Sequence, residues 1–175
     1  MVDSCSCLAQ QRRAVLGIAA AGLVTAASKP VLSWAVDKPA YEAMLLSCID
    51  PRMVDPVHGY MNGRGLDRRY SQFVFAGAAI GVKAPAFASW RPAFWDNLAT
   101  SIELHRVSRL IAIDHRDCGA AKIAYGADSI ATPQVETETH RRVLMTFKAE
   151  VARRYPKLQV EGLLMDLDGN VQVLA

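Results

Sequence analysis

"AMLLSCIDPR", residues 43–52, is the stretch from which the fold can be worked out. It begins with a short apolar run, and such runs are typical of strands that are buried on both faces of a parallel sheet. The run ends in three polar or ionisable side chains at alternate positions, Cys48, Asp50 and Arg52. Pro51 pushes the residue before it towards extended geometry, so we expect the three side chains to lie on one side of an extended segment.

Two further apolar runs predict strands, at residues 71–78 and 107–113. Between them, Phe94, Leu98 and Ile102 recur every four residues, which predicts an amphipathic helix. Strands that alternate with helices indicate an α/β domain with a mainly parallel central sheet flanked by helices. In such sheets, binding sites gather beyond the carboxyl ends of the strands.

The C-terminal part of the chain predicts one more helix and a final pair of strands. Pro156 ends the helix, because proline removes a backbone donor and clashes with the preceding turn. Residues 158–175 then predict a strand, a turn at residues 168–170 and a last strand. The stretches 53–69 and 81–93 are expected to be loops or short helices over the site. The helix before Pro156 is indicated by apolar residues at helical spacing: Val143, Leu144, Phe147 and Val151.

Residues 1–35 are predicted to be an export signal. Arg12 and Arg13 precede an apolar stretch, residues 14–27, which is too short to cross a bilayer because a span needs about 20 apolar residues. Paired arginines, a short apolar stretch and a small-residue cleavage motif at residues 33–35 are together typical of the twin-arginine export route.

The alternative for this segment is a buried first helix of the domain. Gly17, Gly22 and the absence of a polar face argue against that alternative. We therefore expect a single domain over residues 36–175, located in the bacterial periplasm and without a stable membrane anchor after cleavage. The net charge of the whole chain, +3, is too small to indicate a nucleic-acid or membrane-surface partner.

The cysteines point to a second motif. The chain contains four of them, and Cys5 and Cys7 lie in the predicted signal, so the predicted mature domain keeps Cys48 and Cys118. His115 and Cys118 stand immediately after a predicted strand, in an H-x-x-C spacing. Cys118 also begins a short helical stretch, and the N-terminus of a helix favours a thiolate over a thiol.

The two cysteine motifs occupy equivalent places, each at the carboxyl end of a predicted parallel strand. Because neighbouring strands lie about 4.8 Å apart, Cys48, His115 and Cys118 can converge on one point. Two thiolates and an imidazole form a ligand set that suits Zn²⁺, and three protein ligands with an open fourth position is the catalytic pattern. The alternative is a disulfide between the two cysteines, with no metal.

Asp50 and Arg52 extend this candidate site. Arg52 can hold the carboxylate of Asp50 with a two-pronged hydrogen bond. Held in this way, Asp50 can orient a metal-bound water; released from Arg52, it can instead act as a fourth ligand and close the site. The alternative is an exposed ion pair of little consequence.

C-x-D-x-R (Cys48, Asp50, Arg52) followed by H-x-x-C (His115, Cys118) resembles the β-class carbonic anhydrases. The local sequences "SCIDPR" and "HRDCGAAK" match the character of that family's motifs. The resemblance implies that Cys48, His115 and Cys118 bind zinc and that Asp50 and Arg52 form a catalytic dyad. The implied activity is reversible hydration of CO₂ to bicarbonate by a zinc-bound hydroxide.

The resemblance covers most of residues 43–126 and implies the fold of the family, together with a homodimer or a higher homo-oligomer. A proton must also reach solvent during CO₂ hydration. His58, His105 and His140 are candidate shuttles by the ordinary pKa of histidine. His105, on its predicted helix, is interpreted as structural, and none of the three is chosen as the shuttle.

Three departures from the family's pattern keep other functions open. Residues 76–79 are alanine-rich where the family has a polar strand ending, Asp114 replaces a glycine before the zinc histidine, and little precedes Cys48 to wrap a partner subunit. Asp114 would either support a metal ligand from behind or mark an altered loop. The alternatives are hydrolysis of carbonyl sulfide or carbon disulfide at the same zinc site, or a non-catalytic zinc protein of this fold.

Overall fold

The computed structural model of the protein describes residues 41–175, so the predicted export signal lies outside the described residues. The strands of the described part are β1 (Ala43–Ser47), β2 (Tyr70–Val74), β3 (Arg109–His115), β4 (Gln159–Met165) and β5 (Val171–Val173). They form one five-stranded sheet in the order β2-β1-β3-β4-β5. Neighbouring strands are parallel except for β5, which pairs antiparallel with β4. The predicted fold class, a mainly parallel α/β sheet flanked by helices, is confirmed.

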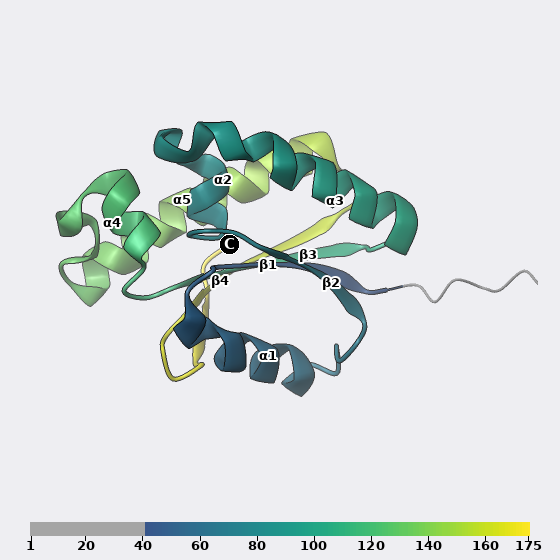
Figure 1. Cartoon of the computed structure of the whole chain (residues 1–175), viewed down its shortest axis with the longest axis horizontal. Helices are drawn as coiled ribbons and strands as arrows, with labels where there is room; N and C mark the ends of the chain where they lie inside the picture. The colour runs from purple at the N-terminus through teal and green to yellow at the C-terminus, as the bar shows by residue number, and fades with distance from the viewer. Residues whose placement is uncertain (1–40) are drawn as a thin grey trace, which may run out of the picture. The chain divides into compact units, whose positions relative to one another are not determined.

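Helices cover both faces of this sheet. Helix α1 lies on one face, and α2, α3 and α5 lie on the other (Figure 1). The helices are α1 (Val54–Gly63), α2 (Ala79–Lys83), α3 (Arg91–His105), α4 (Gly119–Tyr125) and α5 (Pro133–Arg154). Short 3₁₀ turns precede or connect them, at Pro51–Met53, Pro85–Trp90 and Ala127–Ile130.

Strand β1 is buried along its whole length because its side chains alternate between two cores. Met44 and Leu46 pack in the core that also contains Phe94 of α3. Ala43 and Leu45 point the other way, into the core shared with α1. An apolar residue at every position, with no polar alternation, is what a central parallel strand with helices on both faces requires.

The two long helices follow the predicted patterns, with one difference in length. Phe94 and Leu98 of α3 are fully buried, as the four-residue spacing predicts. Helix α5 begins well before its predicted apolar stripe, because Thr132 caps its first turn by accepting a hydrogen bond from the amide of Val135. Pro133 occupies the first turn, where the missing amide hydrogen costs nothing.

The stretch 53–69, predicted to be loops or short helices, contains the ten-residue helix α1. Val57 and Met61, four residues apart, are the buried residues of this helix. The stretch 81–93 contains the end of α2, the 3₁₀ turn Pro85–Trp90 and the start of α3. Both stretches are therefore more regular than their glycine and proline content suggests.

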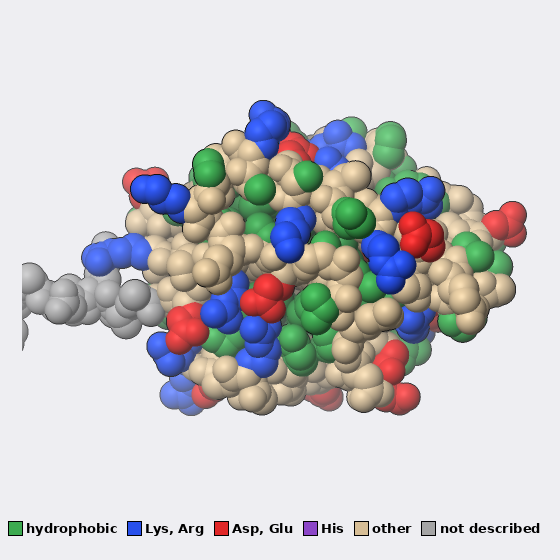
Figure 2. Space-filling model, turned by 180° about the vertical axis from the view of Figure 1, so that it is seen from behind, with side chains coloured by type: hydrophobic (Ala, Val, Ile, Leu, Met, Phe, Trp, Pro, Cys, Tyr) green, Lys and Arg blue, Asp and Glu red, His purple; other side chains and the backbone are tan. Residues whose placement is uncertain are grey.

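Charged side chains are distributed over the surface without a patch of one sign on the face seen in Figure 2, where lysines and arginines alternate with acidic residues. This pattern agrees with the small net charge of +3. Within residues 41–175, none of the helices combines the length and the apolar character that crossing a membrane would demand.

Candidate metal centre

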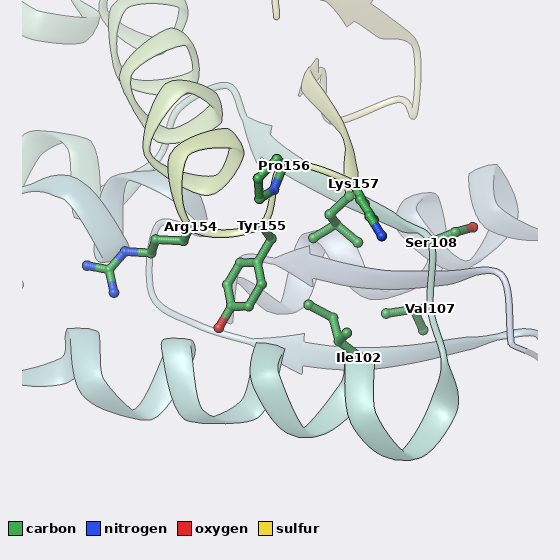
Figure 3. A pocket seen from close by; sticks show the side chains of 8 residues that line it. Ile102, Val107, Ser108, Arg154, Tyr155, Pro156 and Lys157 are labelled. Carbon is green, nitrogen blue, oxygen red and sulfur yellow. The ribbon is translucent and has the colours of Figure 1, made fainter.

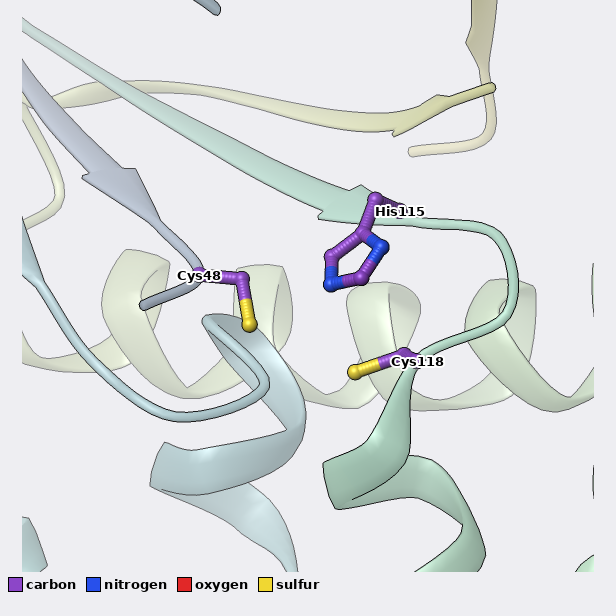
Figure 4. A group of neighbouring side chains, drawn as sticks. All are labelled: Cys48, His115 and Cys118. Carbon is purple, nitrogen blue, oxygen red and sulfur yellow. The ribbon is translucent and has the colours of Figure 1, made fainter. Parts of the chain in front are cut away.

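The parallel pairing of β1 with β3 brings the two cysteine motifs together. Cys48 directly follows β1, His115 is the last residue of β3, and Cys118 is the N-cap of α4. One ligand atom of each residue lies within 4.8 Å of the corresponding atoms of the other two. Figure 4 shows the three side chains pointing towards one another, Cys48 from the end of one strand, and His115 and Cys118 from the two ends of the loop that follows β3. His115 and Cys118 are each 1% exposed and Cys48 is 9% exposed, so the cluster is largely closed to solvent.

The imidazole of His115 is oriented as a metal ligand would be. Its Nδ1 donates a hydrogen bond to the backbone oxygen of Arg116 at 2.8 Å, which fixes the proton of the neutral ring on that nitrogen. The Nε2 atom is buried and has no hydrogen-bond partner among the described residues. A buried nitrogen lone pair beside two sulfur atoms is costly unless something binds it, so the donor set fits a metal ion.

The two sulfur atoms differ in their affinity for a proton. The pKa of Cys48 is lowered to about 4, chiefly by a hydrogen bond from the Cys118 thiol, and also by His115 and the amide of Gly77; burial opposes the shift. The pKa of Cys118 is raised because its proton is shared with Cys48 and because the thiol is buried. Burial lowers the pKa of His115, but the nearby negative charge of Cys48 and the backbone oxygen of Arg116 more than offset it, so the pKa is raised. Of the two sulfur atoms, Cys48 therefore gives up its proton more readily than Cys118.

The expectation that 48–52 stays extended is wrong, although the predicted two-pronged hydrogen bond is present. Asp50 is extended, as the residue before a proline should be, but the chain then turns into the 3₁₀ segment Pro51–Met53. Pro51 suits the first position of such a turn as well as an extended chain, so the proline alone does not decide between the two. The side chain of Asp50 caps the turn by accepting from the amide of Arg52 at 3.0 Å.

Arg52 holds both carboxylate oxygens of Asp50. Its Nε donates to Oδ1 at 3.0 Å and its Nη2 donates to Oδ2 at 2.7 Å. These hydrogen bonds lower the pKa of Asp50 to about 2, because they stabilise the ionised carboxylate. Oδ2 of Asp50 lies 3.9 Å from Nε2 of His115, so the carboxylate borders the space between the ligand atoms.

Asp117 belongs to the same network, and sequence reasoning missed it. Arg52 donates from Nη1 to Oδ2 of Asp117 at 2.9 Å and from Nη2 to its backbone oxygen at 3.2 Å. Lys122 donates to the other carboxylate oxygen at 2.8 Å. Asp117 has a φ of 55°, a conformation that aspartate tolerates better than most residues. An aspartate beside a cysteine in "HRDC" is the only signal in the sequence, and it does not indicate which arginine the side chain meets.

An apolar pocket of about 340 Å³ opens beside Cys48 and Asp50. The rings of Phe87 and Trp90 stack in its wall with centroids 4.7 Å apart. Of the alanine-rich stretch predicted to line the site, Ala76 and Gly77 reach the pocket. Ala78 and Ala79 are instead fully buried, in the core behind it. The remaining lining residues are Ile49, Pro51, Gly119, Ala120 and Ile123.

A second hollow, of about 460 Å³, lies at the other end of β3, beside Ser108 and away from the cysteines (Figure 3). Its walls are mostly apolar, and Arg154 and Lys157 are the charged residues that line it. It contains no cysteine, histidine or carboxylate. Of these two pockets, the one at the carboxyl end of the sheet therefore contains the cysteine and the carboxylate.

The structure separates the candidate proton shuttles. His58 is exposed, and it lines a pocket that also reaches Cys48. The ring of His105 packs against Tyr41 at 4.9 Å, next to the N-terminal end of β1, and is thus remote from the cluster. His140 is fully buried in α5, where its Nδ1 lies 2.9 Å from Oδ2 of Asp114. Asp114 accepts hydrogen bonds from His140 and from the amide of Ala79. Its carboxylate therefore supports the turn before α2 and does not contact a candidate metal ligand directly.

Comparison of the sequence with known proteins identifies two relatives. No family model matches the chain. An uncharacterized protein of Rickettsia conorii is 30% identical over 129 residues, which cover 74% of this chain and 69% of that protein. An uncharacterized protein of Rickettsia bellii is 29% identical over 129 residues, which cover 74% of this chain and 79% of its own length.

Among solved structures, the carbonic anhydrase of Glaciozyma antarctica superposes with a TM-score of 0.51 at 17% identity, covering 78% of this chain and 83% of that chain. The β-carbonic anhydrase CafD of Aspergillus fumigatus superposes with a TM-score of 0.53 at 10% identity, covering 78% of this chain and 91% of that chain. The Coccomyxa β-carbonic anhydrase in complex with acetazolamide superposes with a TM-score of 0.51 at 14% identity, covering 82% of this chain and 76% of that chain. At these identities the likeness establishes the β-carbonic-anhydrase fold alone.

Proposed function

We propose a function from the premise that this chain belongs to the same family as the uncharacterized protein of Rickettsia conorii and has the fold of the β-carbonic anhydrases. The proposed function is that of a zinc-dependent carbonic anhydrase, which hydrates CO₂ reversibly to bicarbonate. The observation that carries it is the Cys48–His115–Cys118 cluster, with the arginine-clamped carboxylate of Asp50 at its border.

Zinc is the proposed metal because of the donor set. Cys48, Cys118 and Nε2 of His115 offer two sulfur atoms and one nitrogen, a set that Zn²⁺ prefers and that hard cations such as Mg²⁺ avoid. When bound, zinc would supply the Lewis acidity that lets a water molecule lose a proton near neutral pH. The buried, unpartnered Nε2 supports this assignment on the protein side.

Asp50 and Arg52 are proposed to orient the water. Arg52 keeps Asp50 ionised and in place, so the carboxylate can accept a hydrogen bond from a water between it and the three ligand atoms. A water held by such an acceptor presents its oxygen lone pair to the substrate. If Arg52 releases Asp50, the carboxylate is near enough to become a fourth ligand and close the site.

The apolar pocket is proposed to receive the substrate. CO₂ is small, linear and without net charge, and a wall of Phe87, Trp90, Ala120 and Ile123 offers it a surface from which water is easily displaced. The same wall favours a second candidate function, hydrolysis of carbonyl sulfide or carbon disulfide by the same site. Turnover of the three compounds measured side by side distinguishes the two functions.

The test of the proposal is metal content and CO₂ hydration of the mature protein beside two variants. We expect about one zinc per chain in the wild type. Cys118→Ser should lose the metal, whereas Asp50→Asn should keep it and lose most of the activity. Asp128→Asn, an exposed carboxylate on another segment, is the matched control and should behave as the wild type.

Zinc-loaded wild type without turnover of any of the three compounds would contradict the enzymatic function and support a non-catalytic zinc protein. Protein that contains no zinc and no free thiol would support the disulfide alternative, although the structure gives both Cys48 and Cys118 as free cysteines.

Two further proposals come from the sequence. Export to the periplasm by the twin-arginine route rests on Arg12 and Arg13 and the apolar stretch after them. N-terminal sequencing of the mature protein, with an Arg12→Lys, Arg13→Lys variant, tests it. Assembly into a homodimer or higher oligomer rests on the family resemblance, and light scattering of the mature protein tests it.

A further inference from the structure

A carboxylate and an imidazole that the proposed function does not use are buried directly behind the metal centre. Asp114, next to His115 at the end of β3, and His140 of α5 have side chains with no exposed surface. Nδ1 of His140 lies 2.9 Å from Oδ2 of Asp114. Burial of two such polar groups costs stability unless both are hydrogen-bonded, so the pair is expected to serve a purpose beyond packing.

The other oxygen of Asp114 holds the first turn of α2. Oδ1 accepts a hydrogen bond from the amide of Ala79 at 2.9 Å. The residue at the N-cap of α2 is Ala78, and an alanine side chain cannot accept from the helix amides. Asp114 therefore performs from a distant strand the capping that the local sequence does not provide.

The turn that Asp114 holds is strained. Ala78 has a φ of 47°, which is uncommon and unfavourable for a residue with a side chain. Gly77 before it has a φ of 76°, and a Cβ at this position would lie 2.7 Å from the Cβ of Ala120. A strained turn persists only where its surroundings fix it, and the hydrogen bond from Ala79 to Asp114 is such a fixing contact.

This strained turn carries a direct contact to the metal centre. The amide of Gly77 donates a hydrogen bond to Sγ of Cys48 at 3.2 Å. An amide hydrogen directed at a thiolate stabilises its negative charge and thereby reduces the electron density that the sulfur gives to a metal. The position of this amide depends on the same turn that Asp114 holds through Ala79.

We propose that Asp114 and His140 are positioning residues for the metal centre: His140 orients Asp114, Asp114 holds the turn at Ala78–Ala79, and the turn directs the Gly77 amide at the Cys48 sulfur. The inference rests on the proposed metal site. It assigns a role to the aspartate that replaces the glycine of the family's pattern. It also explains why an alanine with positive φ is tolerated beside the site.

The first experiment measures the turn itself and does not depend on metal. In the mature protein, the amide hydrogens of Gly77 and Ala79 should be protected from exchange. Asp114→Ala removes the acceptor, and exchange at both amides should become at least about tenfold faster. Asp114→Asn keeps an oxygen that can accept from Ala79 and should restore most of the protection.

The second experiment measures how strongly the Cys48 sulfur donates charge to a bound metal. In protein loaded with Co²⁺, the thiolate-to-cobalt absorption band of Asp114→Ala should move to lower energy, because the sulfur that loses its hydrogen bond donates more charge. The dissociation constant for Co²⁺ should rise about tenfold, as expected when a group that supports a ligand is removed. His140→Ala should move both quantities in the same direction, and Asp114→Asn should return them towards the wild type.

A matched control separates positioning from loss of stability. Val151→Ala removes a fully buried side chain from the same helix as His140, towards its other end. It should lower the unfolding temperature and leave the cobalt band and the Gly77 exchange unchanged. Asp114→Ala protein with the wild-type band, wild-type Co²⁺ affinity and protected Gly77 would overturn the proposal.

The outcome for the proposed function is read separately. Wild type that binds Co²⁺ and shows the shifts in the Asp114 variants, yet hydrates no CO₂, supports the positioning role while the carbonic anhydrase function fails. Wild type that binds neither Zn²⁺ nor Co²⁺ overturns both.

Discussion

Arg52 and Asp117 join the two motifs of the site: Nη1 of Arg52 donates to Oδ2 of Asp117 at 2.9 Å across a separation of 65 residues. The same guanidinium holds both oxygens of Asp50. Its orientation is therefore fixed from two sides, by the segment that carries Cys48 and by the segment that carries Cys118. A displacement of either segment would be transmitted to the Asp50 carboxylate.

Replacement of Asp117 by alanine should lower activity without removing the metal. Arg52 would lose one of its two carboxylate partners and would hold Asp50 less firmly, so we expect kcat for CO₂ hydration to fall about tenfold. Asp117 is half exposed, but its φ of 55° suits alanine less well than aspartate, so the free energy of unfolding should fall by about 1 kcal/mol. Asp128→Ala is the control, and equal activities of the two variants would contradict the role of Asp117.

Metal affinity should rise with pH. Cys48, with a pKa of about 4, is already a thiolate at neutral pH, whereas the raised pKa of Cys118 means that its proton must leave when a metal binds. Each pH unit should therefore increase the apparent Zn²⁺ association constant about tenfold or more, and His115 adds to the effect at pH values below its raised pKa. Competition with a chromophoric chelator at several pH values measures the slope. A flat profile would show that no proton is released.

Gly77→Ala should damage the fold and the site together. The added Cβ would lie 2.7 Å from the Cβ of Ala120, and φ is +76°, so we expect a loss of about 1–3 kcal/mol in the free energy of unfolding. Zn²⁺ affinity should fall as well, because the amide that donates to Cys48 would be displaced.

Gly65→Ala provides the comparison, since Gly65 also has a positive φ, +71°, but has open space around its Cα. Its cost should come from the backbone alone, and Zn²⁺ affinity should be unchanged. Equal Zn²⁺ affinities in the two glycine variants would argue against a link between the turn and Cys48.

The Lys83–Glu150 contact should make stability depend on pH. Burial raises the pKa of Glu150, but hydrogen bonds from Lys83 at 2.6 Å and from Arg154 outweigh burial and hold the pKa below the usual value of a glutamate. A carboxylate with a lowered folded-state pKa contributes stability that is complete above about pH 4.5 and is lost as pH falls through the folded-state pKa.

Glu150→Gln should therefore cost about 0.5–1 kcal/mol near neutral pH, and the difference from the wild type should shrink in acid. Denaturant unfolding at a series of pH values measures it. Glu138→Gln, which removes a more exposed partner of Arg141 on the same helix, should show little pH-dependent difference.

The sequence predicted the fold and the cluster for local reasons. The apolar run before Cys48 and the run before His115 each identify a buried strand, and parallel strands end on the same side, so convergence followed. The predicted extended path of residues 48–52 was wrong, because Pro51 is compatible with both an extended chain and the start of a turn. Only the capping contact of Asp50 decides between them.

The remaining site contacts could not be predicted because they depend on packing between distant segments. Asp114 meets His140 only because α5 crosses the end of β3, and no local pattern fixes that crossing. Asp117 reaches Arg52 through a left-handed backbone conformation that the sequence permits but does not require. Both residues are ordinary acidic side chains until the chain is folded.

The pairing of β1 with β3 also sets where this chain can change in length. Cys48 and His115 are brought together by one step between neighbouring strands, so residues added in the connections between Cys48 and β3 need not alter their separation. One residue inserted inside β1 or β3 would instead turn every following side chain of that strand to the opposite face. Relatives that differ by insertions in α1 or before α3 can therefore share the cluster, whereas a single insertion in either strand would remove it.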